Sequence, residues 1–191
     1  MVERGRLVVF SGPSGVGKDT VLDRVRDAID GFVVCATATT RAMRPGESDG
    51  NPYWFLTIEE FERRIAAGAF LEHARVNGGN WYGTPRDWVD ARRDEGLDVI
   101  FKIDVQGGAA IRERAPEAVL IFLEPPSLEE LERRLRSRGT ESEDQIRTRL
   151  EDARNELSYR DQYDYRVVND HLAVAADKVR AILIAERCRN R

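Results

Sequence analysis

Eight consecutive residues, Gly12-Pro13-Ser14-Gly15-Val16-Gly17-Lys18-Asp19, have the types and spacing that phosphate binding requires. Glycines let a loop curl until its backbone N–H groups point inward at one anion, and the start of a following helix adds a favourable dipole. A lysine at the end of such a loop supplies a compact positive charge for the β- and γ-phosphates of a nucleoside triphosphate. The stretch therefore predicts a phosphate-binding loop of the Walker A type, with Lys18 as its cation.

The flanking sequence favours this interpretation over an ordinary glycine-rich turn. The apolar run Leu7-Val8-Val9-Phe10 precedes the loop, and a helical pattern begins at Thr20. The order strand, loop, helix is the context that a Walker A motif requires. One position departs from the motif, because Asp19 stands where a Mg²⁺-binding serine or threonine is usual. A carboxylate is a competent Mg²⁺ ligand, so the departure concerns the metal and leaves the phosphate cradle intact.

A second polar stretch carries two arginines, Arg41 and Arg44, three positions apart. Guanidinium groups match phosphate oxygens bidentately, which makes paired arginines candidates for an anion site. Tyr53 and Tyr82 add phenolic donors that can reach the same anion. Spacing alone leaves a solvated surface loop as the alternative.

Glu72 stands in an otherwise apolar, strand-like run at residues 70–76, where a carboxylate needs a partner. A guanine ring offers one, because its N1–H and N2–H₂ donors lie side by side, whereas adenine presents no such pair of donors on that edge. Thr37 can add a hydroxyl contact to the base. The alternative is an acidic residue at the surface of an edge strand.

Composition limits the class of protein. A chain of 191 residues fits one domain with a real core, and a net charge of −4 implies no general affinity for nucleic acid. The two cysteines, Cys35 and Cys188, are far apart and lack metal-ligand spacing, so we expect reduced thiols. We find neither a signal peptide nor an apolar segment long enough to span a bilayer. A cytoplasmic protein without a membrane partner is therefore expected.

Strand-like runs alternate with helical patterns along most of the chain, and residues 37–51 read as a loop. Strands are expected at residues 7–10, 32–35, 53–56, 70–76, 99–103, 119–123 and 167–168. Helices are expected at residues 20–25, 57–68, 85–95, 127–137, 142–157 and 172–185. Strands joined by helices imply a parallel sheet with helices on its faces, that is, an α/β fold of the P-loop NTPase type. Residues 36–86 are rich in loops and aromatic residues and resemble an inserted lobe.

The sequence resembles the guanylate kinases along nearly its whole length. The order and combined spacing of the matching stretches are highly specific, although only the phosphate loop is decisive alone. The matches are Ser11–Lys18, Thr39-Thr40-Arg41 with Arg44 and Gly46-Glu47, Gly50 with Tyr53 and Phe55, Phe70 with Glu72, Tyr82-Gly83-Thr84, Ile103-Asp104 with Gln106-Gly107, Arg138-Gly139-Thr140-Glu141, and Val168-Asn169-Asp170. The resemblance implies one domain over residues 1–191, with a core at 1–35, 87–137 and 151–191, a mixed α/β GMP-binding lobe at 36–86 and a helical lid at 138–150.

The resemblance also implies roles for individual residues. ATP would be bound by Gly12, Pro13, Ser14, Gly15, Val16, Gly17, Lys18, Asp19 and Thr20, with Asn169 near the adenine. The phosphate of GMP would be held by Arg41, Arg44, Tyr53 and Tyr82, and the guanine would face Glu72, Thr37 and Thr84, with Asp104 between the guanosine and metal sides. The catalytic candidates are Lys18, Arg138 and Arg149. Mg²⁺ would enter with ATP, near Asp19 and, through water, Asp104.

Lys102 is a second departure, because the family resemblance implies an acidic residue there. In a strand, residues 102 and 104 point to the same face, so Lys102 is expected beside Asp104. It can then pair with Asp104 or Glu72, or extend the positive charge of the phosphate site.

The expected activity is transfer of the γ-phosphoryl group of ATP to GMP or dGMP, giving ADP and GDP in purine nucleotide metabolism. Such transfer rests on positioning and electrostatics, so no general base is needed. The alternatives are a P-loop kinase for another phosphorylated acceptor, such as a sugar phosphate, and a non-catalytic binding module of the same fold. A regulatory GTPase is rejected, because the sequence has no Asn-Lys-x-Asp motif. The choice between monomer and homodimer stays open.

Overall fold

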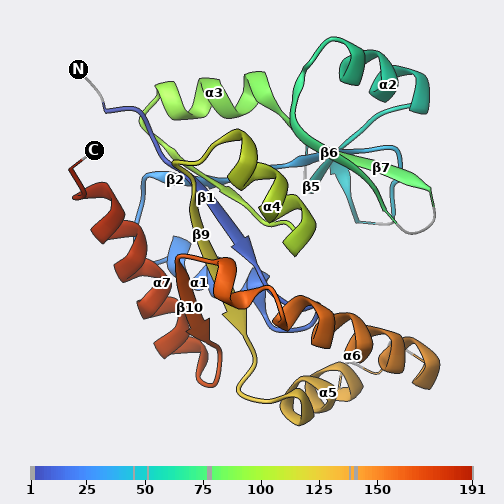
Figure 1. Ribbon diagram of the computed structural model, residues 1–191, viewed down its shortest axis with the longest axis vertical. Coiled ribbons are helices and arrows are strands. Elements are labelled where there is room, and N and C mark those ends of the chain that lie inside the picture. Colours follow the sequence, from blue (N-terminus) through green and yellow to red (C-terminus); the bar gives the residue numbers. More distant parts are fainter. Residues whose placement is uncertain are drawn as a thin grey trace. The chain divides into compact units, whose positions relative to one another are not determined.

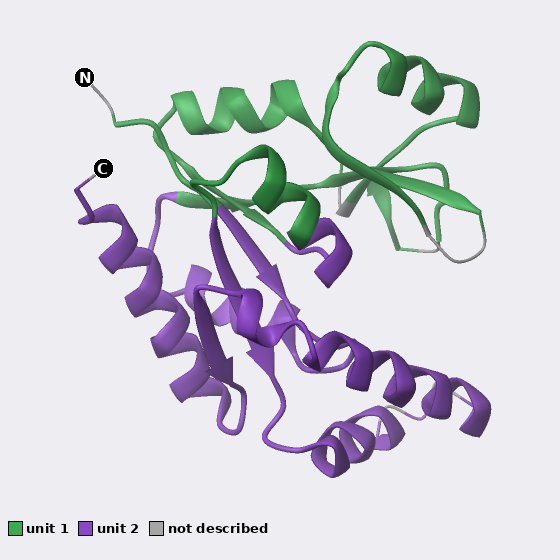
Figure 2. Cartoon of the chain, viewed as in Figure 1, with its two compact units in different colours: residues 1–7, 32–101, 109–118 green, residues 8–31, 102–108, 119–191 purple. Residues whose placement is uncertain are grey.

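The structure is a computed structural model that describes residues 3–44, 46–50, 52–76, 79–137, 139 and 142–190 (Figure 1). The chain divides into two compact units (Figure 2). Unit 1 comprises residues 1–7, 32–101 and 109–118, and unit 2 comprises residues 8–31, 102–108 and 119–191. In the described part of the chain, no helix is both long and apolar enough to cross a membrane. The division into core, GMP-binding lobe and lid stays a prediction.

Unit 2 contains three strands in the order β10-β9-β1, which pair in parallel. They are β1 (Leu7–Ser11), β9 (Val119–Glu124) and β10 (Tyr165–Val168). Phe10 lies opposite Ile121 in this register. Every residue of β1 and β9 is buried, as expected for parallel strands covered on both faces. This buried sheet carries the phosphate loop at the end of β1.

The described part of unit 2 also contains the helices α1 (Lys18–Arg26), α5 (Leu128–Ser137), α6 (Glu143–Leu157) and α7 (Leu172–Arg187) and a 3₁₀ turn (Arg160–Gln162). The helices α5 and α6 bury one small apolar cluster, which consists of Leu131, Leu135, Ile146, Leu150 and Ala153. A capping box fixes the start of α6, because the Ser142 side chain accepts from the Gln145 N–H and the Gln145 side chain accepts from the Ser142 N–H.

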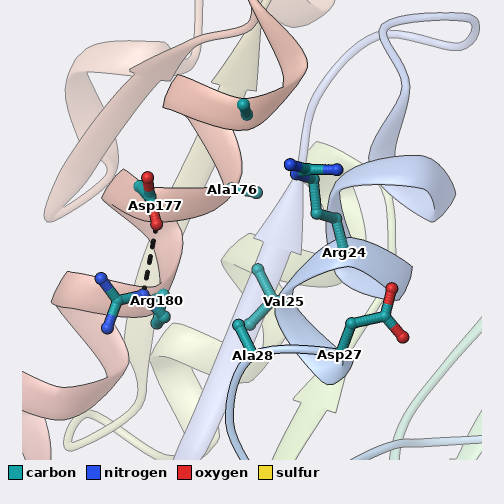
Figure 3. A pocket seen from close by; sticks show the side chains of 8 residues that line it. Arg24, Val25, Asp27, Ala28, Ala176, Asp177 and Arg180 are labelled. Carbon is teal, nitrogen blue, oxygen red and sulfur yellow. Dashed lines mark hydrogen bonds and ion pairs between the residues drawn. The ribbon is translucent and has the colours of Figure 1, made fainter.

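The helices α1 and α7 pack against each other and leave a pocket of about 260 Å³ (Figure 3). Its floor is apolar, with Val25, Ala28 and Ala176, and charged side chains surround it. Arg180 Nε donates to Asp177 Oδ1 at 3.3 Å within this rim. None of the residues predicted to bind a nucleotide lines this pocket.

Unit 1 pairs β2 (Phe32–Val34) with β8 (Asp98–Phe101) in parallel and adds α3 (Arg86–Asp94). A second sheet has the order β4-β5-β3-β7-β6. Its strands are β3 (Thr37–Thr39), β4 (Ser48–Asp49), β5 (Pro52–Phe55), β6 (Phe70–Val76) and β7 (Asn80–Pro85). The strand β7 runs antiparallel to both β3 and β6, so the sheet is mixed.

The helix α2 (Ile58–Ala66) packs on this second sheet through Phe61. The ring of Phe61 stacks on Phe70 at 4.4 Å and on Trp81 at 5.8 Å between centroids. Thr57 caps the helix, since its side chain accepts from the Glu60 N–H. These contacts hold β6 and β7 in place, and both strands carry predicted site residues.

Most predicted elements lie within two residues of their expected ends, but residues 37–51 are not a continuous loop. They contain β3 and β4, whose pairing partners lie elsewhere in the second sheet. Neither β7 nor the helix α4 (Val105–Arg114) was predicted. Gly107 and Gly108 lie inside α4, and glycine is a poor helix former, which explains why no helix was expected there.

The strand expected at residues 99–103 ends at Phe101. The carboxylate of Asp104 accepts from the Gly107 N–H at 2.8 Å and so caps the start of α4. Residues 102–104 therefore form a connection, and the strand argument that placed Lys102 beside Asp104 is wrong.

Candidate active site

Three glycines of the phosphate loop, Gly12, Gly15 and Gly17, have a positive φ. Gly12 has a φ of 146° and Gly17 a φ of 101°, values that side chains other than glycine rarely permit. A Cβ on Gly12 would lie 2.0 Å from the carbonyl oxygen of Leu123, and a Cβ on Gly17 would lie 2.8 Å from Asn169 Nδ2. The loop is therefore fitted closely against β9 and the residue that follows β10.

Lys18 opens α1 and turns its ammonium back onto the loop. Its Nζ donates to the carbonyl oxygens of Gly12 and, at 3.2 Å, of Pro13. Burial lowers the pKa of Lys18, and the nearby carboxylate of Glu156 opposes that shift most strongly. The positive charge is thus held within the curl of the loop, as a phosphate site requires.

Asp19 and Lys102 form an ion pair in unit 2 between Oδ1 and Nζ. The Asp19 side chain is 75% exposed and the Lys102 side chain 31% exposed. The prediction that Lys102 pairs with Asp104 or Glu72 is therefore wrong, because its partner is Asp19. This contact could not be predicted from residue spacing, because the two residues lie 83 positions apart.

Glu156, on α6, is a site residue that the sequence reasoning missed. Burial raises its pKa to about 7, the charges of Asp104 and Asp152 add to the rise, and Lys18 opposes it. A single acidic residue in a helical pattern does not indicate a site by its spacing. The proximity of Glu156 to Lys18 becomes visible only in the folded chain.

Two further predicted residues touch the phosphate loop. Arg149, on α6, donates from Nη1 to Ser14 Oγ at 2.6 Å. Asn169 is 6% exposed and donates from Nδ2 to the Val16 carbonyl at 2.8 Å. Arg138 lies outside the described residues. Arg149 and Asn169 are distant from the loop in sequence but belong to the same unit, and both contact the loop.

A pocket of about 320 Å³ opens beside the loop and is lined in part by Gly17, Thr20, Arg134 and Asn169. Arg134 Nη2 donates to the Asn169 carbonyl at 2.9 Å, which ties α5 to the residue after β10. The sequence did not indicate a role for Arg134, because α5 carries several arginines interspersed with glutamates. In contrast to the pocket between α1 and α7, this one adjoins the predicted phosphate site.

In unit 1, Glu72 on β6 and Thr84 on β7 form a buried pair. Thr84 Oγ1 donates to Glu72 Oε1 at 2.6 Å, and the two residues are 1% and 5% exposed, respectively. Glu72 is therefore not a surface acid. Its carboxylate also contributes to the environment of Cys35, where burial raises the pKa of the thiol to about 12. Cys188, by contrast, is exposed.

Arg41 is held by an acidic residue and two aromatic rings. Its Nη2 donates to Glu47 Oε1 at 2.8 Å and to Oε2 at 3.1 Å. The guanidinium lies 5.2 Å from the Tyr53 ring centroid and 5.6 Å from that of Phe55. The hydrogen bond with Glu47 is the main cause that raises the pKa of Arg41. Sequence reasoning noted Glu47 as a match but assigned it no role.

The remaining predicted residues of unit 1 lie around this cluster. Tyr82 packs edge-on against Tyr53 at 6.0 Å between centroids. Thr37 lies opposite Tyr53 in the parallel pair of β3 and β5. Arg44 is exposed, and its backbone N–H donates to Glu47 Oε2 at 2.8 Å. The second sheet thus gathers Arg41, Tyr53 and Tyr82, as predicted, and leaves the Arg44 side chain at the surface.

Among the described residues, no three histidine, cysteine or acidic side chains gather into a group that can hold a metal by itself. Asp19 and Asp104 both lie in unit 2, near the ammonium of Lys18. Mg²⁺ commonly binds through one or two carboxylates together with substrate phosphates and water. The two carboxylates therefore fit a metal that arrives with a nucleotide.

Comparison with known proteins matches residues 4–186 to the model of the guanylate kinase family. A guanylate kinase from Lactococcus lactis is 48% identical over 99% of this chain and 92% of its own length. One from Clostridium perfringens is 48% identical over 97% of this chain and 86% of its own length. The crystal structure of guanylate kinase from Anaplasma phagocytophilum matches with a TM-score of 0.78 and 35% identity, over 98% of this chain and 89% of that one.

Proposed function

The chain belongs to the guanylate kinase family, and we propose that it transfers the γ-phosphoryl group of ATP to GMP or dGMP, giving ADP and GDP or dGDP in purine nucleotide metabolism. The observation that carries the choice of acceptor is the buried Glu72–Thr84 pair. A carboxylate held in place by a neighbouring hydroxyl offers acceptor oxygens in a fixed orientation, which suits the paired N–H donors of a base.

The carboxylate of Glu72 receives the N1–H and N2–H₂ donors of guanine in this proposal. Thr84 fixes the plane of the carboxylate, and Thr37 adds a hydroxyl contact to the base. A site built to hydrogen-bond specific donors can reject analogues that lack them by roughly 10⁴-fold. The proposal therefore includes strong preference for GMP over AMP, CMP and UMP.

The phosphate of GMP is bound by Arg41 with the hydroxyls of Tyr53 and Tyr82, and Arg44 joins them from the surface loop. Glu47 supports this role, since its two bonds to Arg41 hold the guanidinium beside the ring of Tyr53. The acceptor needs no general base, because a phosphate monoester with a second pKa of about 6 is largely doubly ionised at neutral pH.

ATP is bound by the amides of the phosphate loop and by Lys18, with Asn169 beside the adenine. Lys18, Arg138 and Arg149 stabilise the charge on the phosphoryl group as it passes between the nucleotides. An arginine that completes such a site can contribute roughly 10³–10⁵ in rate. The Arg149–Ser14 contact supports this assignment, because it brings α6 to the loop.

Mg²⁺ is proposed as the cofactor that accompanies ATP, where it neutralises charge on the phosphates. Asp19 and, through water, Asp104 would hold it. Asp104 already caps α4 through Oδ1, so its carboxylate is fixed in orientation.

The proposed partners are therefore small molecules, ATP and GMP, without nucleic acid or membrane, and the proposed location is the cytoplasm. The unpaired thiols of Cys35 and Cys188 support a reducing compartment. Light scattering on the purified chain decides between a monomer and a homodimer.

A coupled assay with ATP and Mg²⁺ tests the function when GMP, dGMP, AMP, CMP, UMP and a set of sugar phosphates are offered separately. We expect turnover with GMP and dGMP alone. Turnover with a sugar phosphate and none with GMP would instead support the kinase for another acceptor. Binding of GMP without turnover of any acceptor would support the non-catalytic module.

A further inference from the structure

Both departures from the expected motifs meet in one contact. Asp19 follows the lysine of the phosphate loop, at the position of the usual metal-binding hydroxyl. Lys102 lies on the connection between β8 and α4, and its ammonium pairs with the Asp19 carboxylate. The charge added at one position is matched by the opposite charge at the other.

This pair lies within the electrostatic range of the loop lysine. Lys102 contributes to lowering the pKa of Lys18, and Asp19 opposes that effect. A carboxylate at this place repels the phosphates of an incoming nucleotide, since like charges a few ångströms apart interact unfavourably even near a protein surface. A neutral hydroxyl at the same place causes no such repulsion.

We propose that Asp19 and Lys102 act as one unit that replaces the neutral hydroxyl of a standard phosphate loop. Asp19 offers an oxygen to the metal, and Lys102 cancels the charge of that carboxylate toward the phosphates. Lys102 is thus a positioning residue for nucleotide binding. The inference rests on the ATP site of the proposed function and adds how this chain binds a nucleotide with and without Mg²⁺.

A solvated ion pair without function is the competing explanation, because exposed pairs contribute little to stability. That explanation predicts that neither residue affects nucleotide affinity. It also predicts no coupling between the two substitutions when a nucleotide is bound. Nucleotide affinity therefore separates the two explanations, whereas thermal stability does not.

The experiment measures the dissociation constant of ADP by calorimetry, in EDTA and in excess Mg²⁺, for the wild type, D19S, K102Q and the double variant. In EDTA we expect K102Q to weaken ADP binding about tenfold, because Asp19 is left uncompensated beside the phosphates. D19S is expected to tighten binding about twofold, and the double variant to return within about twofold of the wild type. The effect of K102Q thus shrinks to about twofold in the D19S background.

The metal gives a second readout. The ratio of the dissociation constant in EDTA to that in Mg²⁺ should rise in K102Q, because the metal then takes over neutralisation of Asp19. The same ratio should fall in D19S, because a ligand for the metal is lost. Asp23 and Arg26 form a matched control pair on α1, exposed and also oppositely charged. D23S and R26Q should leave both constants within about twofold of the wild type.

Equal weakening by K102Q in both backgrounds would overturn the inference, since Lys102 would then contact the nucleotide independently of Asp19. An unchanged metal ratio in D19S would also overturn it. If the wild type binds no ADP at all, the ATP site of the proposed function is wrong as well. Failure of the proposed function would thus appear as absent ADP binding in the wild type. Failure of this inference alone would appear as normal ADP binding with additive effects of the two substitutions.

Discussion

The candidate phosphate loop of unit 2 consists of eight consecutive residues that include one lysine, whereas the candidate GMP site of unit 1 gathers side chains from several strands. In the loop, glycine conformation and the turn into α1 create the site. In the second sheet, Thr84 meets Glu72 because β7 pairs with β6, and Tyr82 of β7 meets Tyr53 of β5 across β3. One site is thus built by local geometry and the other by pairing of distant segments.

This difference implies different responses to substitution. A change in the loop should remove phosphate binding and chemistry together. A change in the second sheet should alter the choice or affinity of the acceptor and leave ATP binding intact. Of the following four experiments, the first three test this division and the fourth tests the environment of Lys18, in order of decreasing expected effect.

Lys18→Ala should lower kcat/KM by at least about 10³-fold, because the loop loses its cation for the charge on the transferred group. Steady-state kinetics with ATP and GMP measures the loss. Lys178→Ala, an exposed change on α7, is the control and should retain full activity. Near-normal turnover in Lys18→Ala would contradict the proposed mechanism.

Glu72→Gln should lower kcat/KM for GMP by roughly 10²-fold or more, since the amide places donors opposite the donors of guanine. The affinity for ADP should stay unchanged, because the loop belongs to the other unit. Glu62→Gln on α2, an exposed acid of unit 1, serves as the control. An equal loss of ADP affinity would contradict the division between the sites.

Glu47→Gln should raise KM for GMP about tenfold with little change in kcat, because Arg41 loses its charge-assisted bonds and is held less firmly beside the tyrosines. Titration of GMP at saturating ATP measures both constants. If KM stays at the wild-type value, Arg41 is positioned by the aromatic rings alone.

Glu156→Gln should raise stability at pH 8 relative to the wild type and have less effect at pH 5. The folded pKa of about 7 lies above the ordinary glutamate pKa of 4.5, so the folded state holds this proton more tightly. The unfolded state therefore releases it first, and this contribution to stability decreases as pH rises from about 4.5 to 7. Thermal melts at both pH values measure the difference, and an equal shift at both would be inconsistent with it.

The same division explains what the sequence predicted. The loop from Gly12 to Lys18 was recognisable because its signal is contiguous, and β1 and α1 followed from their apolar patterns. Glu72 was suspected only because an acid in an apolar strand needs a partner, and the burial of that pair confirms the suspicion in part. Its functional role stays a prediction.

The missed features all depend on non-local pairing or on helices with weak propensity. The Asp19–Lys102 pair and the position of Glu156 near Lys18 arise only when α1, α6 and the connection after β8 meet. The strands β3 and β7 are stabilised by each other rather than by their own composition. The alternation argument for Lys102 failed because Asp104 is needed as a helix cap.

The contrast between the two cysteines has a practical consequence. Cys35 is buried, and burial raises the pKa of its thiol to about 12, so almost none of it is ionised at neutral pH. We therefore expect Cys35 to be inert toward maleimides. Cys188, exposed at the end of α7, should react alone. The wild-type chain thus offers one attachment point for a fluorophore on unit 2, and one cysteine introduced on unit 1 would complete a dye pair for measuring the distance between the units with and without nucleotides.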